Sequence, residues 1–476
     1  MSRKSLAALA AGATVVALAA MSPLSPSAAA RSAPQAERGD GERTVVVYRV
    51  PTHDRSDAQK LISSGYDLVE RRQGDDLFVM GDPSTAAGLR RLGFAPTVAE
   101  TMKKPLPHKP PTAAPTTGVN ADTYYGGYHT VDGHYAHLDQ VAAQHPDMAT
   151  VVTYGQSWLR QNGRGGHDLK AICVTKMKQG DCRLSPDATK PRFFLMSQIH
   201  AREITTGEVS WRWIDTLVGG YGKDPDVTAL MDSTEMWVVP ITNPDGVDIV
   251  ASGGDNPILQ RKNADDAQGS SCGWTGQTGV DLNRNAGTHW GGLGTSTQPC
   301  SEIYLGPAAD SEPENSALEG LWRKLYPAVR TGTGDSDPAP ATAKGLMISL
   351  HSDASMVLLP WEADHSLHTG NDAALRALAG KLGSITGYQS GQAGEILYDA
   401  SGGSDDWTYD KLGLASLTIE IGDSDGRGCS GFTPAFSCQD SYFWPKLKPA
   451  LVYAAQQAAA PYRTTDGDDD SAHARH

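Results

Sequence analysis

Residues 192–203 read RFFLMSQIHARE, an apolar run that ends in His200 and Glu203. The apolar half has the length and aromatic content of a buried β-strand. Three positions separate the two polar residues, so a helical turn points both side chains the same way. An imidazole and a carboxylate are two ligands of a catalytic zinc site, which also needs a third ligand and an open position for water. Alone, the pair is more simply explained as a helix cap or a surface pair.

Similar apolar runs recur along the chain, with helical patterns between several of them. They cover residues 149–154, 192–198, 235–241, 345–350 and 415–421. This alternation predicts an α/β fold with a largely buried, partly parallel sheet. In open sheets of this kind, binding sites collect at the carboxyl ends of the strands. The polar motifs of this sequence fall at such strand ends.

His351 follows the apolar run 345–350 and is the candidate for the third metal ligand. With His200 and Glu203 it completes the His₂Glu set of zinc peptidases. The alternative is a hydrogen-bonded structural histidine. Two other histidine pairs could also bind a metal: His134 with His137, and His365 with His368. Neither pair follows a buried strand, so we expect these histidines to face solvent or to have structural roles.

Arginines and one carboxylate supply further candidate chemistry. Arg261 lies in RKN, and Asn283 with Arg284 lies in DLNRN. An arginine can bind a carboxylate with two hydrogen bonds or stabilise a developing oxyanion, although surface salt bridging is the alternative. Glu420 interrupts the apolar run 415–421, where an unpaired carboxylate is costly. Beside zinc it could accept a proton from bound water; otherwise it pairs with an arginine.

The N-terminal quarter of the chain predicts a leader, a small domain and a linker. Residues 1–30 combine a basic start, an apolar run shorter than the ~20 residues of a membrane span, and small residues at the end. They predict a signal peptide, a secreted extracellular protein and no membrane span. Residues 31–102 have the order βαββαβ, a small α+β open sandwich. Residues 103–118 are rich in Pro and Thr and predict an extended linker.

The remaining residues form the main domain, 119–462, and a disordered acidic tail, 463–476. The 476-residue chain has 41 Lys+Arg against 55 Asp+Glu, a net charge of −14, and the acidic excess lies in the main domain. This charge makes nucleic acid an unsuitable partner. A near-neutral to basic small domain suits an intramolecular inhibitor or folding aid, with cleavage near Lys103-Lys104. An inert hinge between two permanent domains is the alternative.

An exported chain with an even number of cysteines suggests disulfide bridges. Sequence proximity favours three local pairs, although other connectivities stay open. The expected pairs are Cys173 with Cys182, Cys272 with Cys300, and Cys429 with Cys438.

Taken together and in order, the motifs resemble the zinc carboxypeptidase family of pancreatic carboxypeptidases A and B and secreted bacterial carboxypeptidase T. The resemblance covers about residues 120–460. The motifs that carry it are HARE, NPDG at 243–246, RKN, DLNRN, LHS, YDASGGSDDW and TIE. It implies helices around a twisted mixed, mostly parallel eight-stranded sheet, one Zn²⁺ ion, and peptide or protein C-termini as substrates. It also implies a zymogen, whose small domain resembles an activation domain and is its own partner. A monomer is expected, since no heptad pattern or exposed apolar stripe indicates an oligomer.

The resemblance assigns the metal and the reacting groups. His200, Glu203 and His351 hold zinc, and Glu420 is the general base that later returns the proton to the leaving amine. Arg261 polarises the scissile carbonyl together with the metal.

The resemblance also assigns the residues that bind substrate. Asn283 and Arg284 bind the terminal carboxylate, Tyr398 closes over it, and Arg202 contacts the peptide further back. Asp405, seven residues after Tyr398, takes the floor of the pocket for the terminal side chain, as in carboxypeptidase B. An acid there pairs with Lys or Arg, although related bacterial enzymes accept both basic and apolar ends.

Two alternatives remain. A peptidase or amidase acting inside cell-wall peptides would not need Asn283 with Arg284 to bind a free carboxylate. A noncatalytic peptide-binding module would be expected to have lost Glu420 or a metal ligand, and this sequence keeps them.

Overall fold

A four-stranded antiparallel sheet with two helices begins the described chain. The computed structural model describes residues 42–105, 122–269, 272 and 277–463, so the predicted signal peptide and acidic tail lie outside the described residues. The strands lie in the order β2-β3-β1-β4. The elements are β1 (Glu42–Pro51), α1 (Arg55–Ser63), β2 (Asp67–Gln73), β3 (Asp76–Gly81), α2 (Thr85–Arg91) and β4 (Thr97–Pro105). This is the predicted βαββαβ order.

Strand β4 corrects the predicted start of the linker. It pairs with β1 as far as Pro105, and the register places Lys104 opposite Arg43 and Lys103 opposite Thr44. Residues 103–105 therefore belong to the sheet, because their backbone groups form ladder hydrogen bonds that an extended linker lacks. Lys104 is buried and donates to Oγ1 of Thr433, and burial lowers its pKa to about 8. The basic pair therefore lies in a sheet with only Lys103 exposed, not in an extended segment, and residues 106–118 of the expected linker lie outside the described residues.

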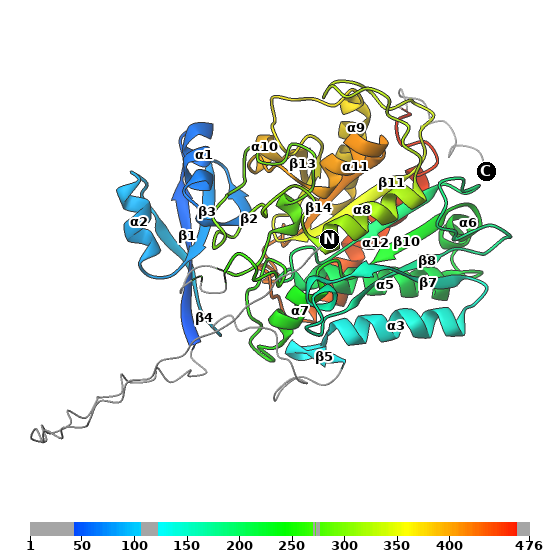
Figure 1. The fold of residues 1–476 in the computed structure, drawn as a ribbon, viewed down its shortest axis with the longest axis horizontal. Helices are drawn as coiled ribbons and strands as arrows, with labels where there is room; N and C mark the ends of the chain where they lie inside the picture. The colour runs from blue at the N-terminus through cyan, green and yellow to red at the C-terminus, as the bar shows by residue number, and fades with distance from the viewer. Residues whose placement is uncertain (1–41, 106–121, 270–271, 273–276, 464–476) are drawn as a thin grey trace, which may run out of the picture. The chain divides into compact units, whose positions relative to one another are not determined.

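The main sheet has eight strands and is mixed, as the resemblance implied (Figure 1). Its order is β13-β12-β14-β11-β9-β10-β8-β7. The central strands β14, β11, β9 and β10 run parallel to one another, and β8 and β7 are antiparallel additions at one edge. The strands are β7 (Ala149–Gln156), β8 (Asp168–Val174), β9 (Arg192–Met196), β10 (Glu235–Val239), β11 (Leu346–Ser352), β12 (Met356–Leu359), β13 (Gln389–Gln392) and β14 (Ala415–Ile421).

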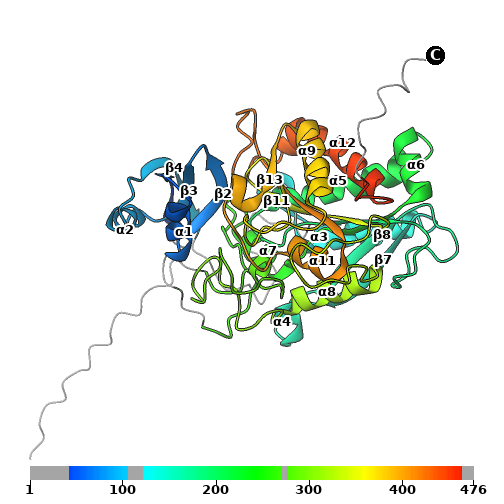
Figure 2. The same ribbon diagram turned by 90° about the horizontal axis from the view of Figure 1, so that it is seen from above.

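Helices cover both faces of this sheet (Figure 2). Alternate residues of β9 show the two faces, because Phe193 packs in the core under α3, α5 and α12, whereas Phe194 packs in the core under α8 and α11. The helices are α3 (Val131–Gln144), α4 (Trp158–Gln161), α5 (Ile204–Gly220), α6 (Pro225–Ser233), α7 (Pro244–Ala251), α8 (Pro313–Leu325), α9 (Asp372–Thr386), α10 (Ala393–Ile396), α11 (Ser404–Leu412) and α12 (Trp444–Gln457). The parallel strands are therefore buried on both sides, which explains their continuous apolar sequences.

Short elements complete the chain. A two-stranded ribbon, β5 (Thr123–Tyr124) and β6 (Tyr128–His129), encloses the 3₁₀ turn Tyr125–Gly127. A second 3₁₀ turn covers Leu282–Arg284, and a π-helical turn, Gln439–Phe443, leads into α12.

The three disulfides are the expected local pairs: Cys173–Cys182, Cys272–Cys300 and Cys429–Cys438.

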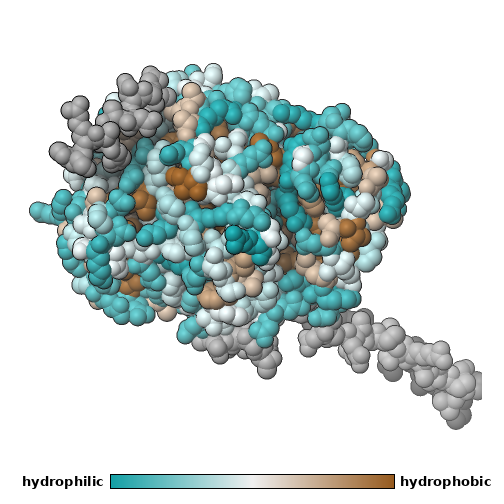
Figure 3. All heavy atoms as spheres, turned by 180° about the vertical axis from the view of Figure 1, so that it is seen from behind, coloured by the Kyte–Doolittle hydropathy of each residue, from teal (hydrophilic) through white to brown (hydrophobic). Residues whose placement is uncertain are grey.

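The surface carries few exposed apolar side chains. On the face drawn in Figure 3, hydrophobic residues form small separate patches among hydrophilic ones. Within the described part of the chain, no helix is both long enough and apolar enough to cross a bilayer.

Candidate active site

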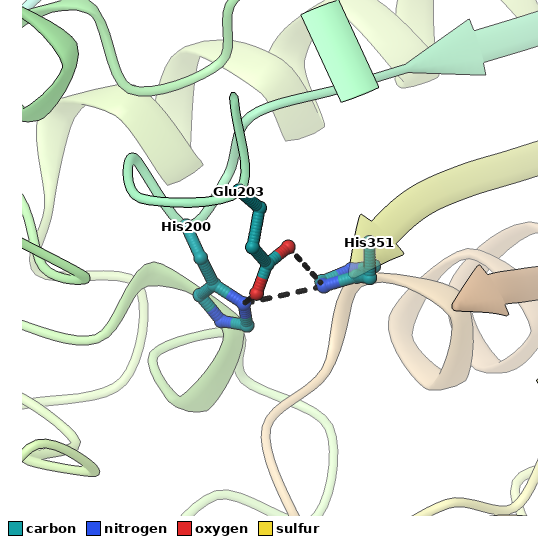
Figure 4. Close-up of side chains that lie close together, drawn as sticks. All are labelled: His200, Glu203 and His351. Atoms are coloured by element: carbon teal, nitrogen blue, oxygen red, sulfur yellow. Dashed lines mark hydrogen bonds and ion pairs between the residues drawn. The ribbon is translucent and has the colours of Figure 1, made fainter. Parts of the chain in front are cut away.

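Three predicted ligands converge at the carboxyl ends of two neighbouring strands (Figure 4). His200 and Glu203 lie on the turn between β9 and α5, and His351 lies near the end of β11. Nδ1 of His200 is 2.6 Å from Oε1 of Glu203 and 3.2 Å from Nδ1 of His351, which is also 3.2 Å from Oε2 of Glu203. All three side chains are buried. Two imidazole nitrogens and a carboxylate so close together can hold one metal ion.

The outer nitrogens of both imidazoles have partners that fix the rings. Nε2 of His200 lies 3.2 Å from Oδ1 of Asp281, and Nε2 of His351 lies 2.9 Å from Oγ of Ser349. These contacts leave both Nδ1 atoms directed at the shared point, as in metal sites whose histidines are oriented by a second carboxylate or hydroxyl. The donor set and its supports therefore fit a zinc ion.

Asp281 also connects this cluster to Arg261. Its Oδ2 accepts from Nε of Arg261 at 2.9 Å, and both side chains are fully buried. Burial opposes the charge of Asp281, but Arg261 and His200 hold its pKa well below the usual value. One carboxylate thus orients an imidazole and a guanidinium at once. Nη2 of Arg261 is buried and has no hydrogen-bond partner among the described residues.

Glu420 lies beside the cluster on the adjacent strand. In the parallel pairing of β11 with β14, Glu420 is opposite His351. The side chain is buried, and its Oε2 finds no hydrogen-bond donor in the described part of the chain. Burial and the nearby Glu203 carboxylate raise the pKa of Glu420 well above its usual value. An unpaired carboxyl group therefore faces the reacting region, where a general base is needed.

Asn283 and Arg284 lie on the 3₁₀ turn that follows Asp281. Oδ1 of Asn283 accepts from the backbone N–H of Ser404 at 3.1 Å, and Arg284 donates from Nε to the carbonyl of Gly294 at 2.8 Å. Gly402 has φ +79°, and a Cβ there would lie 2.4 Å from the carbonyl oxygen of Arg284. Glycine at 402 therefore lets the two loops approach closely.

Asp405 is the second residue of α11 and is fully buried. Its Oδ1 accepts from the N–H of Asp406 at 2.9 Å, and burial together with Asp406 raises its pKa to about 7. Tyr398 is also buried, and burial raises its pKa. Neither Ser404 nor Asp406 caps α11 with a side chain, because Gly403 is the capping residue.

Two carboxylates of the small domain bind the arginines of the site. Asp67 of β2 accepts from both terminal nitrogens of Arg202, each at 3.0 Å. Glu70 of the same strand accepts from Nη1 of Arg261. Arg202 and Arg261 are fully buried, so these are desolvated ion pairs.

The sequence missed the connecting role of Asp281, although its motif was singled out, and missed Asp67 and Glu70 altogether. The only sequence signal of Asp67 and Glu70 was that they are acidic residues on a predicted strand. The rival histidines differ in environment. His137 is buried and stacks on Trp211 with ring centroids 3.7 Å apart, His365 is half-buried and lies 2.9 Å from Asp399, and His368 is exposed. A solvent-facing role is therefore wrong for His134 and His137, which are both buried.

The chain is similar to known proteins in sequence. Residues 134–443 match the family model described as zinc carboxypeptidase. Carboxypeptidase B of Bos taurus is 30% identical over 319 residues, covering 66% of this chain and 66% of that protein. Carboxypeptidase A2 of Mus musculus is also 30% identical, over 310 residues, covering 64% of each. The chain thus spans slightly less than two thirds of the length of these relatives.

A solved structure shares the fold. Carboxypeptidase A from Helicoverpa armigera superposes with a TM-score of 0.66 at 22% identity, covering 87% of this chain and 97% of that one. The matched residues 134–443 include every predicted site residue.

Proposed function

The chain belongs to the zinc carboxypeptidase family, and from this premise we propose that it is a secreted metallocarboxypeptidase that removes C-terminal residues one at a time. The observation that carries the proposal is the buried convergence of His200, Glu203 and His351 beside an unpaired Glu420. The first three residues hold one zinc ion. A bound zinc ion supplies an activated water and polarises a carbonyl.

The remaining groups of the site transfer the proton of the attacking water and stabilise the scissile carbonyl oxygen. Glu420 accepts a proton from water at Oε2 and returns it to the nitrogen of the leaving residue. Arg261 directs Nη2, which lacks a partner among the described residues, at the scissile carbonyl oxygen. Asp281 keeps Arg261 in place, so the guanidinium does not need to reorganise during the reaction.

Asn283 and Arg284 bind the free carboxylate of the substrate, and this contact makes the enzyme an exopeptidase. Both side chains are held by backbone groups of neighbouring loops, which fixes where a carboxylate can sit. Tyr398 closes over the bound C-terminal end of the substrate. Asp405 attracts Lys or Arg as the terminal side chain because a buried carboxylate lowers the free energy of a cation placed beside it.

The small domain keeps the intact chain inactive. Asp67 and Glu70 occupy Arg202 and Arg261, the two arginines assigned to the peptide and to the scissile carbonyl. Glu70 accepts from Nη1 of Arg261, so its carboxylate lies against the guanidinium that a substrate carbonyl has to approach through Nη2. Cleavage between residues 106 and 121, outside the described ranges, activates the zymogen by releasing these carboxylates.

The test compares the intact protein with protein cut at a protease site placed in 106–121. Blocked dipeptides ending in Arg and in Phe are the substrates, with chelator, zinc add-back and Glu420→Gln as controls. We expect chelator-sensitive release by the cut protein only, with Arg faster than Phe. Faster release of Phe refutes the basic preference, and cleavage only of peptides with an amidated end favours the endopeptidase or amidase. Peptide binding without any cleavage by metal-loaded protein favours the noncatalytic module.

A further inference from the structure

A second buried carboxyl group lies against Asp405. Glu362 follows β12, is 4% exposed, and its carboxyl group interacts electrostatically with that of Asp405. A Cβ built on Gly403 would be 3.1 Å from Oδ1 of Asp405 and 3.9 Å from Oε2 of Glu362. Both acids therefore lie close to Gly403, and Oδ1 of Asn283, which is assigned to the substrate's carboxylate, is 3.8 Å from the same Cβ position.

The segment that carries Glu362 is held in place from α11. Oδ1 of Asp406 accepts from the N–H of Glu362 at 2.9 Å, and Oδ2 accepts from the N–H of Ala363 at 3.0 Å. The carbonyl of Glu362 accepts from the N–H of Ala400 at 2.8 Å. The two consecutive acids of α11 thus contact different parts of Glu362. Asp406 fixes its backbone, and Asp405 faces its side chain.

The pair has spare acceptors and no cation of its own. Oε1 of Glu362 and Oδ2 of Asp405 are buried without a hydrogen-bond partner among the described residues. The charged groups with the largest effects on Glu362 are Asp405, Asp406 and Glu420, which are all acids. His289 lies 3.8 Å from Asp406, the neighbour of Asp405 in sequence. Such a cluster is costly unless a cation enters it.

We propose that Glu362 is a second specificity-determining residue, and that Glu362 and Asp405 together bind the guanidinium of a C-terminal arginine. This inference rests on the proposed function and adds to it a preference for Arg over Lys. A guanidinium has N–H donors on two sides in one plane and can reach both carboxyl groups, whereas an ammonium is a compact point charge. A terminal Phe needs neither carboxylate.

The pair shares a proton when no cation is bound. Burial and Asp405 raise the pKa of Glu362, and burial and Asp406 raise that of Asp405 to about 7. An entering guanidinium favours the ionised forms, so binding of arginine expels this proton to solvent. The ratio of kcat/KM for Arg over Phe then rises with pH through about 7, and ionisations common to both substrates cancel in the ratio.

The experiment uses the cut, zinc-loaded protein and blocked dipeptides ending in Arg, Lys and Phe at pH 6 and pH 8. The variants are Glu362→Gln, Glu362→Asp and Asp405→Asn. The control is Glu319→Gln, which changes another buried acid whose pKa is raised to about 8. We expect Glu362→Gln to lower the Arg/Phe ratio about tenfold to a hundredfold at pH 8, to reduce Arg/Lys selectivity, and to flatten the pH dependence. Glu362→Asp restores part of each effect.

A readout without turnover separates the two proposals. Calorimetric titration of Glu420→Gln protein with L-arginine, in buffers of different ionisation enthalpy, counts protons released on binding. We expect release from this protein and a smaller release when Glu362→Gln is added. An unchanged Arg/Phe ratio in Glu362→Gln, with Phe still cleaved, overturns the inference and leaves the proposed function standing. Absent hydrolysis of all substrates with proton-linked arginine binding refutes only the proposed function.

Discussion

The ion pair between Asp67 and Arg202 offers a direct measure of how strongly the small domain blocks the site. Its arginine is fully buried and its aspartate side chain is 11% exposed, with two hydrogen bonds of 3.0 Å. Removing one partner of a buried pair typically costs about 3 kcal/mol or more, because the other charge remains desolvated. In Asp67→Asn protein, this free-energy cost destabilises the state in which the small domain is docked on the main domain.

A loss of about 3 kcal/mol corresponds to a factor of about 150 in the docking equilibrium. We therefore expect the intact Asp67→Asn chain to gain activity by up to two orders of magnitude. Once the variant chain is cut and its small domain removed, the remaining main domain is identical to that of the wild type and has the wild-type rate. The assay is initial-rate hydrolysis of a blocked dipeptide by intact chain, with electrophoresis to verify that it is uncut.

A matched control changes a carboxylate on the same hairpin that does not reach the site. Asp75 has a 78% exposed side chain and lies 3.4 Å from Arg72, so Asp75→Asn should leave the latency unchanged. If intact Asp67→Asn protein is as inactive as wild type while the cut form is active, the ion pair does not maintain latency and the reasoning is refuted.

Three further predictions concern the metal, pH and the disulfides. Asp281→Asn weakens zinc binding about 10- to 100-fold, measured by competition with a chelator, because His200 loses an orienting carboxylate. Burial raises the pKa of Glu314 from 4.5 to about 8, so its stabilising effect is full below pH 4.5 and is lost as pH rises towards 8. Glu314→Gln should therefore raise the unfolding temperature by about 2 °C or more at pH 8 and less at pH 5. Replacing Cys429 and Cys438 by Ser removes a short closed loop and lowers the unfolding free energy by about 3 kcal/mol in denaturant titration.

Each of these has a result that contradicts it. Unchanged zinc affinity in Asp281→Asn shows that the imidazole is oriented without the carboxylate. A pH-independent effect of Glu314→Gln shows that Glu314 is ionised in the folded chain. Unchanged stability without the Cys429–Cys438 bridge shows that the loop is already ordered by its packing.

The parts of the fold with strong periodic signals were predicted correctly. The apolar runs around Phe193, Trp237 and Ile348 became the central parallel strands because both faces of each are buried. Strand β13 could not be predicted, since QSGQ is polar and contains glycine. It exists because β12 offers it a parallel edge, which is long-range information that local propensity does not contain.

The candidate site likewise contains some residues that the sequence predicted and others that it did not. His200, Glu203 and His351 were predicted because each follows a buried strand. Glu362 and Asp281 were not assigned, since an acid beside an apolar run carries no sign of what it faces. Their partners, Asp405 and Arg261, lie 43 and 20 positions away in sequence and meet them only in the folded chain.

Strand β4 determines what remains of the small domain after the proposed cleavage. Because the strand runs through Pro105, a cut between 106 and 121 leaves the four-stranded sheet whole, with Asp67 and Glu70 still side by side on β2. The released fragment then remains a folded competitor that returns to the site in a bimolecular step. Activity after processing should accordingly depend on total protein concentration, low in a concentrated secretion and high once the mixture is diluted. Under the proposed zymogen mechanism, dilution would therefore control the onset of activity together with proteolysis.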